Sequence, residues 1–129
     1  MPVNETILAS EVFDRLQEAM ASDRAGFTEL YRDFLADGWQ TLRMLRDAVQ
    51  EKQAEEVVGR AHYLKSSCLV LGACVVARCA ARLEEMGHNA DLAVADAALK
   101  QTWQAMQEIQ TELSERLGAG VIPPGQVAA

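Results

Sequence analysis

His62 is the side chain in this sequence best suited to act as a nucleophile. Neutral imidazole is a good nucleophile near neutral pH. On a helical wheel with 100° per residue, His62 falls nearly opposite an apolar face, so we expect it to point to solvent from the middle of a helix. Lys65, three residues further on, lies beside His62 on the wheel and can reach an anion attached to the imidazole. The pair can therefore accept and hold a negatively charged group.

The residues around His62 indicate that something must approach it closely. Gly59 and Ser66 lie one turn before and one turn after it, and both are small. Glycine costs about 1 kcal/mol in a helix interior relative to alanine, so its presence here calls for a reason. Three apolar residues share this otherwise polar face, namely Val58, Leu69 and Val70. We predict that these five residues form a docking surface. Geometry alone also allows the alternative that His62 is an ordinary surface residue without a function.

Apolar residues at helical spacing predict the elements that carry this face. A short helix over about residues 10–20, capped by Ser10, precedes a long one that starts at Ser22-Asp23 and reaches about Gln50. Gly38 interrupts the apolar stripe of this second helix, which weakens the case for its continuity. The helix with His62 runs from about Ala54 to Leu71 and stops at Gly72.

Two further helices complete the prediction. One follows Gly72 almost at once and ends at residues 87–89, with Asn89 as a candidate cap for the next. The last runs from about Ala90 to Leu117, and its apolar residues repeat every seven positions, as in the seam of a bundle: Leu92, Leu99, Met106 and Leu113. Short connections predict antiparallel neighbours. We expect one all-α domain spanning residues 1–129, an antiparallel up-down four-helix bundle over about 22–118 with a short additional N-terminal helix. A flexible tail follows over about 119–129.

Composition restricts the classes of partner. The chain has 12 Lys and Arg against 19 Asp and Glu, a formal net charge of -7, and its basic residues form no stripe, so we expect no nucleic-acid or membrane partner. There is no signal-peptide pattern and no apolar run long enough to span a bilayer. Three closely spaced cysteines fit reduced thiols. We expect a cytoplasmic monomer with protein partners.

The stretch AHYLKSSCLVLGA, residues 61–73, resembles the signature of histidine-containing phosphotransfer (HPt) domains, roughly A-H-x-L-K-[GS]-S-x-x-x-[LIV]-G-[AL]. Residues 79–84, CAARLE, resemble the family's next helix. The likeness covers about residues 25–117. The position after the lysine is often glycine in the family and is Ser66 here, which is still small.

The resemblance implies a phosphoryl carrier in a multistep two-component phosphorelay. His62 would take the phosphoryl group from a receiver-domain aspartate of a hybrid sensor kinase and pass it to the aspartate of a response regulator, and Lys65 would offset the phosphoryl charge. The phosphorelay would be bacterial. Its receiver domains would supply Mg²⁺, so the carrier would need no cofactor and no metal of its own. Phosphoryl transfer depends mainly on positioning and charge neutralisation, which fits such a division of labour.

The sequence also allows three other interpretations. A kinase is disfavoured because the sequence has no Gly-rich nucleotide loop, and we expect no autonomous kinase activity. A metal or redox site at Cys68, Cys74 and Cys79 is disfavoured because the cysteines are not paired as C-x-x-C and two fall on core faces. A bundle that serves as scaffold or adaptor, with His62 never phosphorylated, is the remaining alternative.

Overall fold

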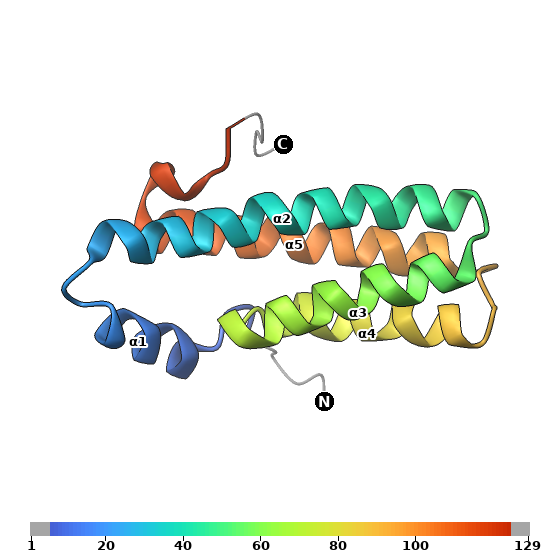
Figure 1. Cartoon of the computed structure of the whole chain (residues 1–129), viewed down its shortest axis with the longest axis horizontal. Coiled ribbons are helices and arrows are strands. Elements are labelled where there is room, and N and C mark those ends of the chain that lie inside the picture. The colour runs from blue at the N-terminus through green and yellow to red at the C-terminus, as the bar shows by residue number, and fades with distance from the viewer. Residues whose placement is uncertain (1–5, 125–129) are drawn as a thin grey trace.

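Four long antiparallel helices form the body of the molecule. The computed structural model describes residues 6–124. In this range lie α1 (Ser10–Ala19), α2 (Arg24–Gln50), α3 (Ala54–Leu71), α4 (Cys74–His88), α5 (Ala95–Leu117) and a short 3-10 helix, η1 (Ala119–Val121), and no strand. From α2 to α5 each helix runs opposite to the one before it (Figure 1), and α2 also packs on α5. The predicted all-α up-down bundle with a short N-terminal helix is confirmed.

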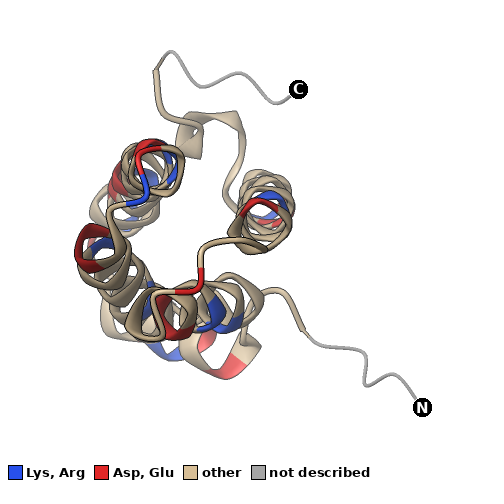
Figure 2. Cartoon of the chain, turned by 90° about the vertical axis from the view of Figure 1, so that its right-hand side faces the viewer, with Lys and Arg blue, Asp and Glu red and all other residues tan. Residues whose placement is uncertain are grey.

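The apolar stripes of the four long helices meet in a common core. Gly38 does not interrupt α2, which continues through it to Gln50. The glycine is buried, and a Cβ at this position would lie 2.4 Å from Met106 Cε of α5. The helix therefore tolerates Gly38 because its missing side chain makes room for Met106. The view along the bundle shows acidic and basic residues interspersed around its outside (Figure 2).

The ends of α2 and α3 follow the predicted stop and start signals. Asp23 caps α2, and its side chain accepts a hydrogen bond from the Gly26 amide at 2.9 Å. Gly72 ends α3 in the left-handed conformation at φ +85°, which a residue with a Cβ rarely adopts. The bounds of α3, Ala54 to Leu71, are those predicted. The helix that carries His62 is thus delimited by local sequence.

The N-terminal helix α1 covers one end of α2 and α3. Phe13 packs against the rings of Phe27 and Tyr31, and the Tyr31 hydroxyl donates to the Leu71 carbonyl at 3.0 Å. The predicted cap at Ser10 is wrong, because Ser10 is already helical and no side chain caps the helix. Instead, the Ala9 amide donates to the Gly72 carbonyl at 2.8 Å. The start of α1 is therefore set by its attachment to the end of α3.

The connection between α4 and α5 is longer than predicted. The last helix begins at Ala95, not near Ala90, and Asn89 does not cap it. Asn89 instead terminates α4, where its amide donates to the Glu85 carbonyl, and Ala90 follows with φ +51°. These residues complete the end of α4, so α5 starts several residues later.

The first residues of the predicted flexible tail are structured. Residues 119–121 form η1, which packs on α2 and α5, and Val121 is fully buried. The prediction of a flexible tail that starts at residue 119 is therefore wrong for residues 119–121. Burying the apolar side chain of Val121 against the bundle is favourable and holds η1 in place. Residues 122–124 follow η1 without forming a helix, and the remainder of that prediction, residues 125–129, lies outside the described residues.

Candidate functional site

His62 lies on the exposed face of α3, opposite the face that packs in the core. Its side chain is 60% exposed. The core side of α3 carries the buried residues of this helix: Val57, Ala61, Leu64, Cys68 and Leu71. His62 is therefore presented from a rigid helix whose other face is locked into the bundle, as its place in the sequence predicts.

Glu84 of α4 joins His62 and Lys65 through one carboxylate. Its Oε2 lies 2.8 Å from His62 Nδ1, and its Oε1 accepts a hydrogen bond from Lys65 Nζ at 2.6 Å. The Glu84 side chain is only 14% exposed, whereas His62 stands out above it. Since α3 and α4 pack along their lengths, the carboxylate is held beneath the imidazole by the fold itself.

The charge of Glu84 determines which nitrogen of His62 is available. The hydrogen bond from Lys65 lowers the pKa of the Glu84 carboxyl below its ordinary value, and the hydrogen bond from His62 lowers it further against the opposing effect of burial. An ionised carboxylate can only accept hydrogen bonds, so Nδ1 of His62 carries the proton that faces it. The lone pair of the neutral imidazole is then on Nε2, which points away from Glu84 and is available as the nucleophile.

Glu84 was not among the residues predicted for the site. It ends the stretch CAARLE, residues 79–84, whose resemblance to the family implied no role for this glutamate. Its distance of 22 residues from His62 gives no periodic signal, because the contact depends on how α3 and α4 pack. The second histidine, His88, lies one turn beyond Glu84 with Nε2 4.0 Å from Oε2, and it is also exposed.

Exposed apolar side chains gather on α3 near His62. Among residues 6–124 the large exposed hydrophobics are Tyr63, Leu69, Val70 and Val94, and the first three lie on α3. Leu69 is 60% and Val70 69% exposed, so both stand free as predicted. Tyr63 was missed, because its position next to the histidine falls between the core face and the His62 face.

Of the five predicted docking residues, Val58 is misplaced. It is half-buried, and a Cβ on Gly87 of α4 would lie only 2.7 Å from its Cγ2. Val58 therefore packs in the seam between α3 and α4, and only part of its side chain is exposed. Ser66 is exposed one turn after His62. The other four predicted docking residues, Gly59, Ser66, Leu69 and Val70, are exposed, with Tyr63 beside them, and we call this surface the predicted docking face.

Gly59 is exposed, and the space beyond it is open. A Cβ at this position would meet nothing within 4 Å, in contrast to Gly38 and Gly87, whose missing side chains are filled by neighbours. Packing within the chain therefore gives no reason for a glycine here.

The part of the chain that the structure describes gives little support to a metal site, a redox site or a membrane span. No group of three or more His, Cys, Asp and Glu side chains there is arranged to hold a metal ion. Cys68 and Cys79 are buried and Cys74 is exposed, and none of the three forms a disulfide. Burial raises the pKa of the Cys68 thiol to about 12, which makes it unreactive. None of the helices between residues 6 and 124 has the length and apolar character of a membrane span.

The exposed His62 with Lys65 beside it on an antiparallel bundle matches what the resemblance to phosphotransfer domains implies, and comparison with known proteins agrees. Residues 29–118 match the model of the Hpt domain family. The chain therefore belongs to that family and is a histidine phosphotransfer domain. Its fold is that of histidine-containing phosphotransfer protein B (HptB) from Pseudomonas aeruginosa PAO1, with a TM-score of 0.81 and 24% identity over 88% of this chain and 96% of that chain. No curated protein sequence matched.

Proposed function

We propose that this chain is a phosphoryl carrier of a multistep two-component phosphorelay, with Nε2 of His62 as the acceptor atom. The observation that carries the proposal is the hydrogen bond between His62 Nδ1 and Glu84. It leaves the Nε2 lone pair facing outward on a side chain that is 60% exposed. The incoming group would come from a phospho-aspartate on the receiver domain of a hybrid sensor kinase and leave to the aspartate of a response regulator.

The proposed transfer step uses the residues of the site as follows. The Nε2 lone pair forms the new N–P bond while the P–O bond to the receiver's aspartate breaks, and the electron pair leaves with that carboxylate. The imidazole, now substituted on Nε2 and protonated on Nδ1, gains positive charge, which Glu84 stabilises across 2.8 Å. Lys65, held beside it by the same carboxylate, offsets the charge on the phosphoryl oxygens.

In this proposal the carrier contributes position and charge, and the receiver contributes the metal. Mg²⁺ on the receiver would neutralise the phosphoryl group, so the carrier needs no cofactor and no nucleotide of its own. We accordingly propose that the protein is a cytoplasmic monomer without autonomous kinase activity. Its partners would be receiver domains, and it would bind neither nucleic acid nor membranes. The test is direct incubation of the purified chain with phosphorylated receivers, followed by detection of acid-labile, base-stable phosphate.

Leu69 offers a test of the predicted docking face. Leu69→Glu should weaken receiver binding about fivefold, because an apolar centre of the interface is replaced by a charge. Since Leu69 is 60% exposed, the melting temperature should stay nearly unchanged. Val94→Glu is the matched control, as Val94 is an equally exposed apolar residue in the connection between α4 and α5. A similar loss of binding in both variants would remove Leu69 from the predicted docking face.

Gly59 should show opposite effects on stability and transfer. Gly59→Ala is expected to stabilise the chain by about 0.5–1 kcal/mol, because alanine is the better helix former and its Cβ meets open space. Gly59→Gln should slow transfer from a receiver, because a long side chain then stands one turn from His62. Thermal melts and transfer kinetics on both variants check this. Normal transfer by Gly59→Gln would show that the glycine does not serve access.

A further inference from the structure

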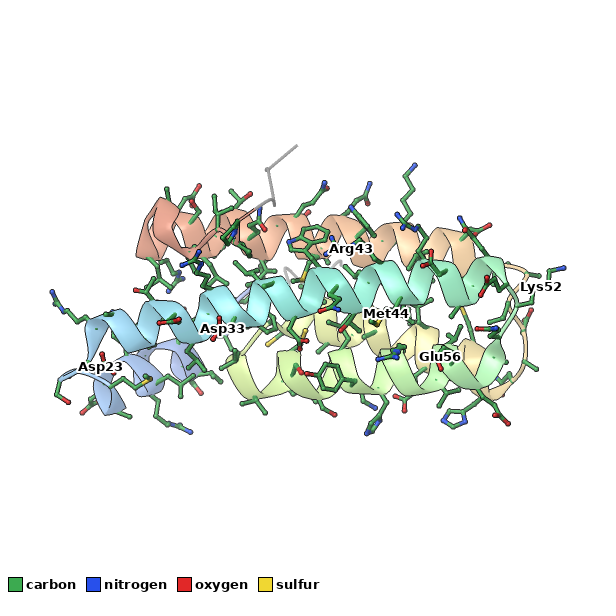
Figure 3. The ribbon with its side chains drawn as sticks, turned by 45° about the horizontal axis from the view of Figure 1, so that its top comes forward. Asp23, Asp33, Arg43, Met44, Lys52 and Glu56 are labelled. Atoms are coloured by element: carbon green, nitrogen blue, oxygen red, sulfur yellow. The ribbon has the colours of Figure 1, made fainter. Side chains whose placement is uncertain are left out.

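A shallow apolar groove runs between α2 and α3 beside the predicted docking face. It has a volume of about 440 Å³, and its walls are formed by Leu30, Phe34, Ser67 and Val70, with Asp33 and Asp37 among its lining. Figure 3 shows Asp33 on the flank of α2 that borders α3. The groove thus combines an apolar floor with two carboxylates from one face of α2.

The two carboxylates differ in what they can offer a partner. Asp37 accepts a hydrogen bond from the Tyr63 hydroxyl at 2.6 Å, which ties α2 to α3 at this point. Asp33 is exposed, and among residues 6–124 its carboxylate has no hydrogen-bond or ion-pair partner. An apolar hollow with one uncompensated negative charge on its rim is complementary to an apolar side chain that has a lysine or arginine close to it.

The groove is continuous with the face that carries His62. Val70 belongs to both, since it is 69% exposed and also forms part of the groove wall. It lies eight residues after His62, or about 12 Å along the helix axis. A protein interface of standard size covers about 800 Å² on each partner, so a receiver seated over His62 extends over the groove.

We propose that this groove, which we call the α2–α3 groove, is a specificity contact for the receiver domain. The groove takes an apolar side chain of the receiver, and Asp33 pairs with a lysine or arginine of the receiver that lies close to that apolar side chain. Receivers that lack a basic residue at this point are poorer partners. The inference rests on the proposed function, because it assumes that a receiver docks at His62, and it adds the chemistry by which partners are selected.

Charge reversal at Asp33 is the test. With a cognate receiver at low salt, Asp33→Lys should slow phosphotransfer about three- to fivefold, through association and not through the chemical step. The difference should shrink as salt is raised, because exposed charges are screened. Asp33→Asn should show a smaller effect in the same direction. Glu108→Lys, an exposed charge reversal on α5, is the matched control and should leave transfer unchanged.

Two further measurements separate this inference from the proposed function. Phosphoramidate, a small donor that needs no docking, should phosphorylate wild type and Asp33→Lys equally. If receivers label the wild type and Asp33→Lys transfers at the wild-type rate at low salt, the groove inference is overturned while the carrier function stands. If no receiver labels the wild type, the carrier function itself fails. Sedimentation showing a dimer that Asp33→Lys disrupts would assign the groove to a second copy of the chain and overturn the inference.

Discussion

Replacing His62 with glutamine is expected to abolish phosphorylation by a receiver while the bundle stays intact. Glutamine keeps a polar side chain on the exposed face of α3 but has no nucleophilic nitrogen. His62 contributes nothing to the core, as 60% of its side chain is in water. The circular dichroism spectrum and melting temperature of His62→Gln should therefore match the wild type, while radiolabel from a phosphorylated receiver should fall to background.

His88 provides the control for this loss. It is the other histidine of the chain, it is exposed, and it lies within 4.0 Å of the same carboxylate. His88→Gln should be labelled normally, because His88 lies outside the matched motif and at the end of α4. Label retained in His62→Gln and lost in His88→Gln would move the acceptor site to His88.

Removing the Glu84 carboxylate is expected to slow transfer about 10- to 100-fold without abolishing it. A hydrogen bond to a charged group contributes about 1.5–3 kcal/mol when it is well formed, and 1.4 kcal/mol corresponds to a tenfold change in rate. In Glu84→Ala the imidazole loses the partner that keeps the proton on Nδ1, and Lys65 loses the acceptor that holds it beside His62. Both changes reduce the fraction of His62 that is ready to react.

A positioning role of Glu84 can be told apart from a structural one. Nitrogen-15 NMR of the His62 ring should show the Nδ1–H tautomer in the wild type and a mixture of tautomers in Glu84→Ala. The neighbouring Glu85 is exposed, and Glu85→Ala is the matched control that should change neither tautomer nor rate. If Glu84→Ala lost activity only in proportion to a loss of folded protein, Glu84 would be a structural residue and the tautomer argument would fail.

Much of the fold could be predicted because its signals are local. Asp23 before α2 and Gly72 after α3 are a cap and a stop that act within one turn, and the structure places both as expected. The errors arose where tertiary contacts decide the outcome. Ala9 bonds to the end of α3, Gly38 accommodates Met106, and Val121 is buried against α2 and α5. None of these contacts leaves a periodic trace in the sequence.

The candidate site shows the same division. The exposure of His62, Leu69 and Val70 could be predicted because the angle between residues on one helix is fixed. The role of Glu84 could not be predicted, because its place beneath His62 depends on the register of α4 against α3. Val58 was misassigned for the same reason: the wheel shows which way a residue points but not that Gly87 lets the neighbouring helix come close enough to cover it.

In the proposed function, a receiver delivers its phosphoryl group to Nε2 of His62. The most direct measurement is phosphorus-31 and nitrogen-15 NMR of the labelled chain after transfer from a phosphorylated receiver, because coupling between the two nuclei identifies the bonded nitrogen. We expect one phosphohistidine signal, coupled to Nε2 of His62, with Nδ1 still protonated toward Glu84. Phosphate bonded to Nδ1 of His62, to His88, or to no nitrogen of the chain would contradict the account.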